Sequence, residues 1–103
     1  MIAKALPFQL FFEIIFLENY QRLEAKERKT VDKATKLISV NPRHPSLNTH
    51  KAKNVKAKYP TGGDDIFIAY ASKDLRVTFE YGPEPGMIAV RNCGHHDTCE
   101  RKV

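Results

Sequence analysis

The sequence lacks an apolar run long enough to cross a bilayer. The sole candidate for such a segment, Ala5 to Leu17, is shorter than the roughly 20 residues that a membrane helix needs, and Gln9 and Glu13 interrupt it. No small-residue cleavage site follows, as a signal peptide would require. We therefore interpret this run as part of the core, and we expect a cytoplasmic protein with no membrane partner.

Cysteine is also scarce. Two cysteines without an export signal indicate a reducing compartment, where Cys93 and Cys99 stay thiols. Both lie in the stretch CGHHDTCE, Cys93 to Glu100, together with His95 and His96. Structural zinc sites usually draw paired ligands from two separated clusters, and the sequence has no second cluster. We therefore disfavour a disulfide loop and a metal site, and we expect a protein that needs no cofactor.

Acidic residues are absent from Lys33 to Gly63. This segment nevertheless carries seven basic residues, more than the net charge of +5 of the whole chain: Lys33, Lys36, Arg43, Lys51, Lys53, Lys56 and Lys58. A field of one sign attracts a polyanion such as nucleic acid. Charge runs are also common on solvated faces, so the pattern alone leaves both interpretations open.

Repeats, heptads and low-complexity tracts are missing as well, and 103 residues with 42% apolar content suit one modest core. Near the N-terminus, alternation predicts a strand with one buried face, formed by Phe8, Leu10, Phe12, Ile14 and Phe16. Helical spacing follows from about Leu17 to Val40, as one helix or as a hairpin that breaks near Lys26 to Thr30. Asn41-Pro42 ends it, because proline cannot continue the helix.

The second half of the sequence predicts strands. Arg43 to Gly63 is expected to be a basic loop with at most one short strand. Three strand candidates follow, Ile66 to Ser72, Leu75 to Tyr81 and Met87 to Cys93, joined by turns that make neighbours antiparallel. Helices against an antiparallel sheet make an α+β sandwich.

Alternation along the last two strands predicts which side chains face the core. Leu75, Val77, Phe79 and Tyr81 would face the helices together with Ile88 and Val90, and the opposite side would carry Arg76, Thr78, Glu80, Met87, Ala89, Arg91 and Cys93. We expect this second face to be open, with Arg76 and Arg91 on it. A slip of one residue would invert the assignment.

Three segments resemble one protein family. They are NPRHPSLNTHKAKN (Asn41 to Asn54), IFIAYASKDLRVTFEYG (Ile66 to Gly82) and IAVRNCGHHD (Ile88 to Asp97), and they are similar to toxins of the RelE/ParE superfamily of bacterial toxin–antitoxin pairs. The resemblance implies one RelE-like domain over residues 1–103, with an N-terminal strand and helices on a small antiparallel sheet. It implies a ribosome-dependent endoribonuclease that cuts mRNA and inhibits translation, with the ribosome, mRNA and an antitoxin as partners.

The same resemblance suggests site residues. The strand arginine is Arg76, the loop histidine is His50, and the closing histidine is His96, followed by Asp97. The chain departs from the pattern twice, since many relatives carry an arginine at the position of Tyr70 and an aromatic residue at that of Glu100.

Cutting RNA without metal uses the adjacent 2′-hydroxyl as nucleophile, so it needs a base, an acid, and cations for the phosphate. Histidine suits the proton transfers because it changes protonation near neutral pH, and arginine suits the phosphate because its fork matches two oxygens. We hypothesise that His50 and His96 share acid and base work and that Arg76 clamps the phosphate. The residues expected to bind the RNA strand are Lys51, Lys53, Lys56, Arg91 and Tyr70, the last as a ring on which a base can stack.

Two other classes of function stay open at this point. A non-catalytic protein of this fold would bind a protein target, as the gyrase-poisoning members of the superfamily do, and would not need the histidines and Arg76. A basic RNA-binding module would bind RNA with steep salt dependence and leave it intact.

Overall fold

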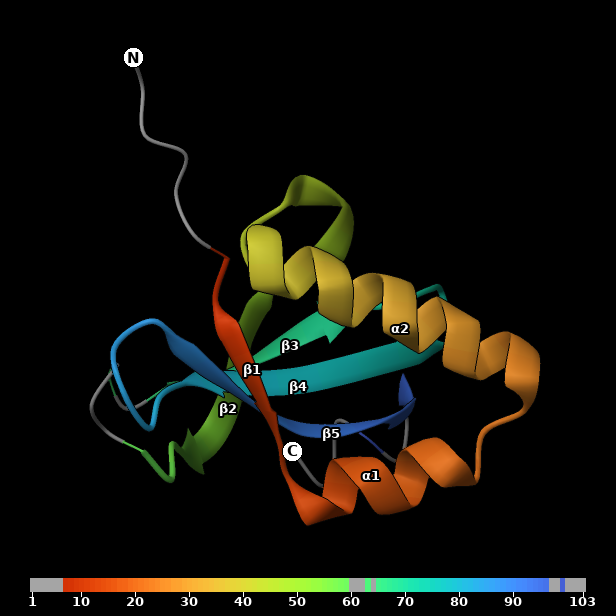
Figure 1. Cartoon of the computed structure of the whole chain (residues 1–103), viewed down its shortest axis with the longest axis horizontal. Helices are drawn as coiled ribbons and strands as arrows, with labels where there is room; N and C mark the ends of the chain where they lie inside the picture. The colour runs from red at the N-terminus through yellow and green to blue at the C-terminus, as the bar shows by residue number, and fades with distance from the viewer. Residues whose placement is uncertain (1–6, 60–62, 64, 97–98, 100–103) are drawn as a thin grey trace.

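The computed structural model describes residues 7–59, 63, 65–96 and 99. Its helices are α1 (Ile14–Gln21), α2 (Ala25–Val40) and the short 3-10 helix η1 (Pro45–Leu47). Its strands are β1 (Gln9–Phe12), β2 (His50–Lys56), β3 (Asp65–Tyr70), β4 (Leu75–Tyr81) and β5 (Met87–His95). In Figure 1, α2 lies across the sheet and α1 lies beside β5. No helix among the described residues is long and apolar enough to cross a bilayer.

The described strands form one sheet in the order β1-β5-β4-β3-β2. The three strands expected from Ile66 onwards are confirmed, and β3, β4 and β5 pair antiparallel as predicted. The first strand differs, because β1 pairs with β5 in the parallel direction. The predicted α+β architecture is therefore confirmed, with one parallel pair at the edge of the sheet.

The N-terminal strand is shorter than alternation predicted. It ends at Phe12, Glu13 caps α1 in an extended conformation, and Ile14 begins the helix with 70% of its surface exposed. Phe16 thus reaches the core from α1 and not from a strand. Its ring stacks on that of Tyr20, one helical turn later, with 5.7 Å between centroids. The prediction was wrong here because the apolar residues fit both periods over so short a run.

Of the two helical arrangements expected, the structure has the hairpin, but its break is earlier than predicted. It falls at residues 22–24, not near Lys26 to Thr30. Glu24 and Glu27 form a capping box in which the Glu27 carboxylate accepts from the Glu24 N–H at 2.9 Å. This cap satisfies backbone N–H groups that the first turn leaves without partners, so α2 begins there. The predicted stop at Asn41-Pro42 is confirmed, since α2 ends at Val40.

The basic segment after α2 contains the strand that the sequence left as an option. His44 is the N-cap of η1, and its Nδ1 accepts a hydrogen bond from the Ser46 N–H at 3.1 Å. Strand β2 then runs antiparallel to β3 at the sheet edge, with a shift in register between Lys51 and Lys56. His50, Lys51, Lys53 and Lys56 therefore lie on an edge strand and not in a loop.

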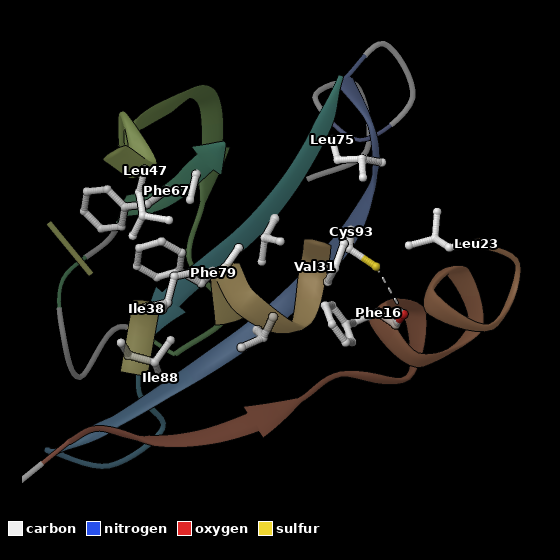
Figure 2. Packing of buried hydrophobic residues seen from close by; sticks show 14 residues of the cluster. Phe16, Leu23, Val31, Ile38, Leu47, Phe67, Leu75, Phe79, Ile88 and Cys93 are labelled. Atoms are coloured by element: carbon white, nitrogen blue, oxygen red, sulfur yellow. Dashed lines mark hydrogen bonds between the residues drawn. The ribbon is translucent and has the colours of Figure 1, made fainter. Parts of the chain in front are cut away.

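The core lies between the helices and one face of the sheet (Figure 2). Val31 and Ile38 of α2, Leu47 of η1, and Val77 and Phe79 of β4 are almost completely buried in it. The β4 residues are the ones that alternation assigned to the core. Cys93 is an exception to the prediction, since its side chain is in this core and its thiol lies 3.7 Å from the Phe16 carbonyl oxygen (Figure 2).

A bulge explains the position of Cys93. Thr78 pairs with Asn92 and Phe79 pairs with Val90, so Arg91 is an extra residue in β5. The extra residue inverts the alternation after Val90, and Cys93 turns inward to pair with Val77. Burial raises the pKa of the Cys93 thiol to about 12, so the thiol stays protonated at neutral pH.

The second face of β4 is not open, contrary to our expectation. Arg76, Thr78 and Glu80 are all buried. The Glu80 carboxylate accepts the backbone N–H groups of Lys58 and Tyr59 at 3.0 and 2.5 Å, which holds this segment over the strand. A carboxylate that accepts hydrogen bonds can be buried at acceptable cost. For this reason, alternation of side chains alone did not predict the burial of Glu80.

Candidate functional site

His50 begins β2 and is held by the residue two positions before it. Asn48 adopts a left-handed conformation (φ 46°), which asparagine tolerates better than most residues. Its carbonyl oxygen lies 3.1 Å from Nδ1 of His50. A carbonyl can only accept, so Nδ1 carries the proton and Nε2 of the neutral ring is left with a lone pair. With its side chain exposed, His50 can therefore present the Nε2 lone pair as a general base.

Tyr70, at the end of β3, brings His50 and Arg76 together. The His50 ring meets the Tyr70 ring edge-on at 5.9 Å between centroids. The Arg76 guanidinium carbon lies 3.6 Å above the centroid of the same ring, a cation–π contact. We call His50, Tyr70 and Arg76 the ring cluster. Tyr70 was predicted to stack a base, and in the structure one side of its ring is taken by Arg76.

Arg76 is anchored in the turn between β3 and β4. Its Nη1 donates to the carbonyl oxygens of Ser72, Lys73 and Leu75 at 3.0, 3.1 and 3.2 Å, and the residue is only 6% exposed. The hydrogen bonds hold the turn in place, and the cation–π contact holds the Tyr70 ring against the guanidinium. A phosphate clamp at Arg76 stays a prediction, because its Nη1 already donates to three carbonyl oxygens.

His96 lies on the other side of the same turn. Its backbone N–H donates to the Asp74 carbonyl at 2.8 Å, and its side chain is exposed. The neighbouring His95 points to a different partner, since its Nε2 lies 3.1 Å from a Glu27 carboxylate oxygen of α2. The two adjacent histidines therefore have different surroundings. Asp97, predicted to accompany His96, lies outside the described residues.

Three lysines of β2 were predicted to hold the RNA backbone, and their surroundings differ. Lys51 forms an exposed ion pair with Asp65 at 3.3 Å. Lys53 and Lys56 are exposed, and neither has an ion pair in the described part of the chain. Lys53 and Lys56 are therefore the more available cations of the edge strand, and they follow His50 by three and six residues.

Arg91, the bulge residue, has its charge engaged elsewhere. Its Nη1 lies 2.6 Å from the fully buried Glu80 carboxylate, which also holds Lys58 and Tyr59. This ion pair is at the far end of β4 from Arg76. The structure therefore brings His50, Tyr70 and Arg76 together, with His96 across the turn, and it places Arg91 in a separate polar network.

The described residues contain no group of three or more histidine, cysteine, aspartate or glutamate side chains that could hold a metal. The thiol of Cys93 points into the core, whereas that of Cys99 lies 3.8 Å from the Arg76 carbonyl oxygen. Both cysteines are free and buried. With His95 turned to Glu27, these side chains do not converge on one point.

Sequence reasoning missed several residues that shape this site. The left-handed Asn48 fixes the His50 ring, and its signal was an asparagine directly after a short Pro-Ser-Leu turn. The carbonyls that bind Arg76 belong to the backbone, so no side-chain pattern could reveal them. The Glu80 network was hidden because alternation assigned that carboxylate to solvent.

Comparisons with known proteins agree with this architecture. No protein-family model and no curated protein matches the sequence. Among solved structures, the archaeal RelE of the RelE–RelB complex from Pyrococcus horikoshii is 13% identical with a TM-score of 0.65, covering 86% of this chain and 94% of that one. The YoeB dimer from Staphylococcus aureus is 17% identical with a TM-score of 0.63, covering 91% and 99%. A chain of the Escherichia coli DinJ–YafQ toxin–antitoxin complex is 10% identical with a TM-score of 0.60, covering 89% and 96%.

At these low identities, the TM-scores establish a shared fold but not a shared activity, which has to be argued from the site. The match extends over nearly the whole length of each solved chain, so the arrangement of helices and sheet is shared as a unit. The RelE-like architecture that the resemblance implied is confirmed. The chain has the fold of the RelE/ParE-like toxin superfamily.

Proposed function

We propose that this protein is the toxin of a toxin–antitoxin pair and that it cuts mRNA on the ribosome without a metal ion. The observation that carries the proposal is the ring cluster, in which a histidine with a free lone pair on Nε2 lies beside Tyr70 and Arg76. The fold shared with RelE, YoeB and YafQ supports it. Ribosomes and mRNA as partners place this activity in the cytoplasm.

In the proposed reaction, Nε2 of His50 takes the proton from a ribose 2′-hydroxyl. The 2′-oxygen then forms a bond to the adjacent phosphorus, and the bond from phosphorus to the 5′-oxygen of the next nucleotide breaks. His96 in its protonated form gives a proton to that leaving oxygen. The products are a 2′,3′-cyclic phosphate and a free 5′-hydroxyl, and the charges balance without a further reactant.

The cations have separate tasks in this proposal. Lys53 and Lys56 attract the phosphates of the strand along β2, with Lys51 adding charge next to Asp65. Arg76 keeps the Tyr70 ring and the turn in place. We further propose that its guanidinium contacts the scissile phosphate, which mutation of Arg76 tests. Charge at the reacting phosphate is usually a large term in such reactions.

The test uses the two adjacent histidines as a matched pair. Purified protein is added to a translating extract with a defined mRNA, and new 5′ ends are mapped by primer extension. We expect cuts during translation, a loss of about 100-fold or more in rate for His96→Gln and for His50→Ala, and a change of less than about threefold for His95→Gln. Equal rates for His96→Gln and His95→Gln would refute the acid role, and an uncut mRNA would refute the nuclease.

A protein partner is the second part of the proposal. Large apolar side chains are exposed at the sheet edge formed by β1 and at the start of α1: Phe11, Phe12, Ile14, Ile15 and Leu17. An apolar surface of this kind normally contacts another protein. The neighbours from Pyrococcus horikoshii and Escherichia coli were solved as toxin–antitoxin complexes. We propose that an antitoxin covers this surface.

One observation favours a different candidate function. Arg76 is buried and its Nη1 is engaged by three carbonyl oxygens, as in a purely structural arginine. A non-catalytic protein of this fold that binds a protein target would need no more from Arg76. That candidate predicts that the mRNA stays intact in an extract in which a known toxin cuts it, while growth inhibition on expression persists.

A further inference from the structure

Four lysines form a row along the outer face of α2, and we call them the lysine row. Lys26, Lys29, Lys33 and Lys36 follow one another at steps of three, four and three residues, and all four are exposed. With about 3.6 residues per turn, these steps keep the four side chains within about a quarter of the helix circumference. The buried Val31 lies on the opposite side of the helix, which packs on the sheet.

The acidic residues of α2 are engaged away from the lysine row. The Glu27 carboxylate accepts the Glu24 N–H in the capping box and lies 3.1 Å from Nε2 of His95. Asp32 accepts a hydrogen bond from the Tyr20 hydroxyl at 2.6 Å. The four lysines have no ion pair within the described residues. The outer face of α2 therefore presents four positive charges, with no acidic partner among them, over about 15 Å of helix.

The lysine row and the ring cluster face opposite sides of the molecule. Val31 of α2 packs in the core with Val77, so α2 covers the face of β4 to which Val77 points. Arg76 precedes Val77 in the strand and points to the other face, where its guanidinium lies on the Tyr70 ring. An RNA strand at the ring cluster reaches the lysine row only by passing around the sheet, so the row is a separate surface.

The residue types of this surface favour a rigid polyanion. Protein interfaces are depleted in lysine and have an apolar centre, but the apolar residues between Lys26 and Lys36 are Val31 and Ala34, and both are buried. Surfaces that bind single strands add aromatic rings on which bases stack, and α2 has no aromatic residue. A straight row of cations without such rings suits the phosphates of a double helix.

We infer that the lysine row of α2 binds the phosphate backbone of double-helical RNA in the ribosome. Double-stranded RNA is recognised mostly by its shape and through its phosphates and 2′-hydroxyls, so a surface without base-reading groups is sufficient. The inference rests on the proposed function and deepens it. One side of the molecule would hold structured RNA while the ring cluster, on the other side, meets the strand to be cut. Because mRNA is single-stranded where it is translated, the double-helical RNA beside it is that of the ribosome.

The first experiment compares two variants that lose the same charge. Lys29→Gln/Lys33→Gln changes the row, and Lys53→Gln/Lys56→Gln changes the edge strand β2. Binding of a labelled, blunt-ended RNA duplex and of one of its strands alone is measured by fluorescence anisotropy at several salt concentrations. All strands carry 2′-O-methyl groups, which remove the nucleophile and prevent cleavage. Circular dichroism establishes that both variants are folded.

We expect the two variants to differ in the RNA that they bind less well. The row variant should bind the duplex about three- to tenfold more weakly, as for the loss of two exposed charge interactions. Its slope of log affinity against log salt should fall by about 1.8, since each neutralised phosphate of a duplex accounts for about 0.9. Its affinity for the single strand should stay within about twofold. The β2 variant should show the reverse preference.

The second experiment uses purified ribosomes and the translating extract. The row variant should sediment with ribosomes less well than the unmodified protein, and the free RNA duplex should compete with the ribosome for the unmodified protein. In the extract, the row variant should need about three- to tenfold more protein for half-maximal cutting of the mRNA, in proportion to its loss of affinity. At saturating protein its rate of cutting should equal that of the unmodified protein, because the ring cluster is unchanged.

The outcomes separate the inference from the proposed function. If both variants lose the same affinity for the duplex, or if the row variant sediments with ribosomes as the unmodified protein does, the inference is wrong and the nuclease stands or falls by its own assay. If the unmodified protein binds duplex and ribosomes through the row but cuts no mRNA, the nuclease is wrong and the docking surface stands. Loss of antitoxin binding by the row variant, with its duplex binding unchanged, would overturn the inference and assign the row to the protein partner.

Discussion

The contact between Arg76 and Tyr70 makes a quantitative prediction about stability. Replacing Arg76 by methionine keeps an unbranched side chain and removes the guanidinium. Because the residue is 6% exposed, solvent screens its interactions little. We expect a cost of about 2 kcal/mol for the desolvated cation–π contact and about 1 kcal/mol for the hydrogen bonds to the turn.

A total near 3 kcal/mol is large for a protein of this size. It corresponds to a fall in Tm of roughly 12 to 24 °C. A variant with this loss can be partly unfolded at assay temperature, and loss of cleavage would then say nothing about phosphate binding. Cleavage by Arg76 variants therefore has to be compared below the temperature at which each begins to unfold.

The measurement is a double-mutant cycle in urea. The free energy of unfolding is determined for the unmodified protein, Arg76→Met, Tyr70→Leu and the double variant, with Tyr70→Phe as the control that keeps the ring. We expect a coupling energy of about 1.5 to 2 kcal/mol between the two positions and a small effect of Tyr70→Phe. A coupling below about 0.5 kcal/mol, the range expected for independent sites, would refute the stacking argument.

Three further predictions concern other parts of the chain. Glu80→Gln should lower the free energy of unfolding by about 2 to 3 kcal/mol, since it weakens a buried site with three donors; a urea midpoint equal to that of the unmodified protein would contradict this. Because burial raises the pKa of Cys93 to about 12 from 9.0, the unfolded thiol ionises first as pH rises. The contribution of Cys93 to stability should be complete below about pH 9 and should fall towards pH 12, by at most about 1.4 kcal/mol per pH unit, and Cys93→Ala should lack this dependence in urea titrations at several pH values. Replacing Lys53 and Lys56 by alanine should weaken RNA binding and reduce the slope of log affinity against log salt by about 1.4, since each phosphate neutralised on a single strand accounts for about 0.7; an unchanged slope in filter binding would exclude these lysines from the interface.

Much of the fold follows from local patterns in the chain. Alternation over Leu75 to Tyr81 placed a strand and its core-facing side correctly, because one face packs on helices and the side-chain period of a strand is two. Asn41-Pro42 marked the end of α2, since proline stops a helix whatever surrounds it. The basic segment Lys33 to Gly63 and the candidate histidines His50 and His96 can likewise be identified from residue types alone.

The site depends on features that residue types do not encode. His50 and Tyr70 meet because β2 pairs with β3 in one particular register. Arg76 can be buried because backbone carbonyl oxygens of a turn accept hydrogen bonds from its guanidinium. The bulge at Arg91 reversed the side on which Cys93 lies, since one extra residue inverts a period of two. Local sequence sets which elements form, whereas registers, bulges and backbone acceptors arise only when distant strands pair, and these decided which of the candidate residues share a site.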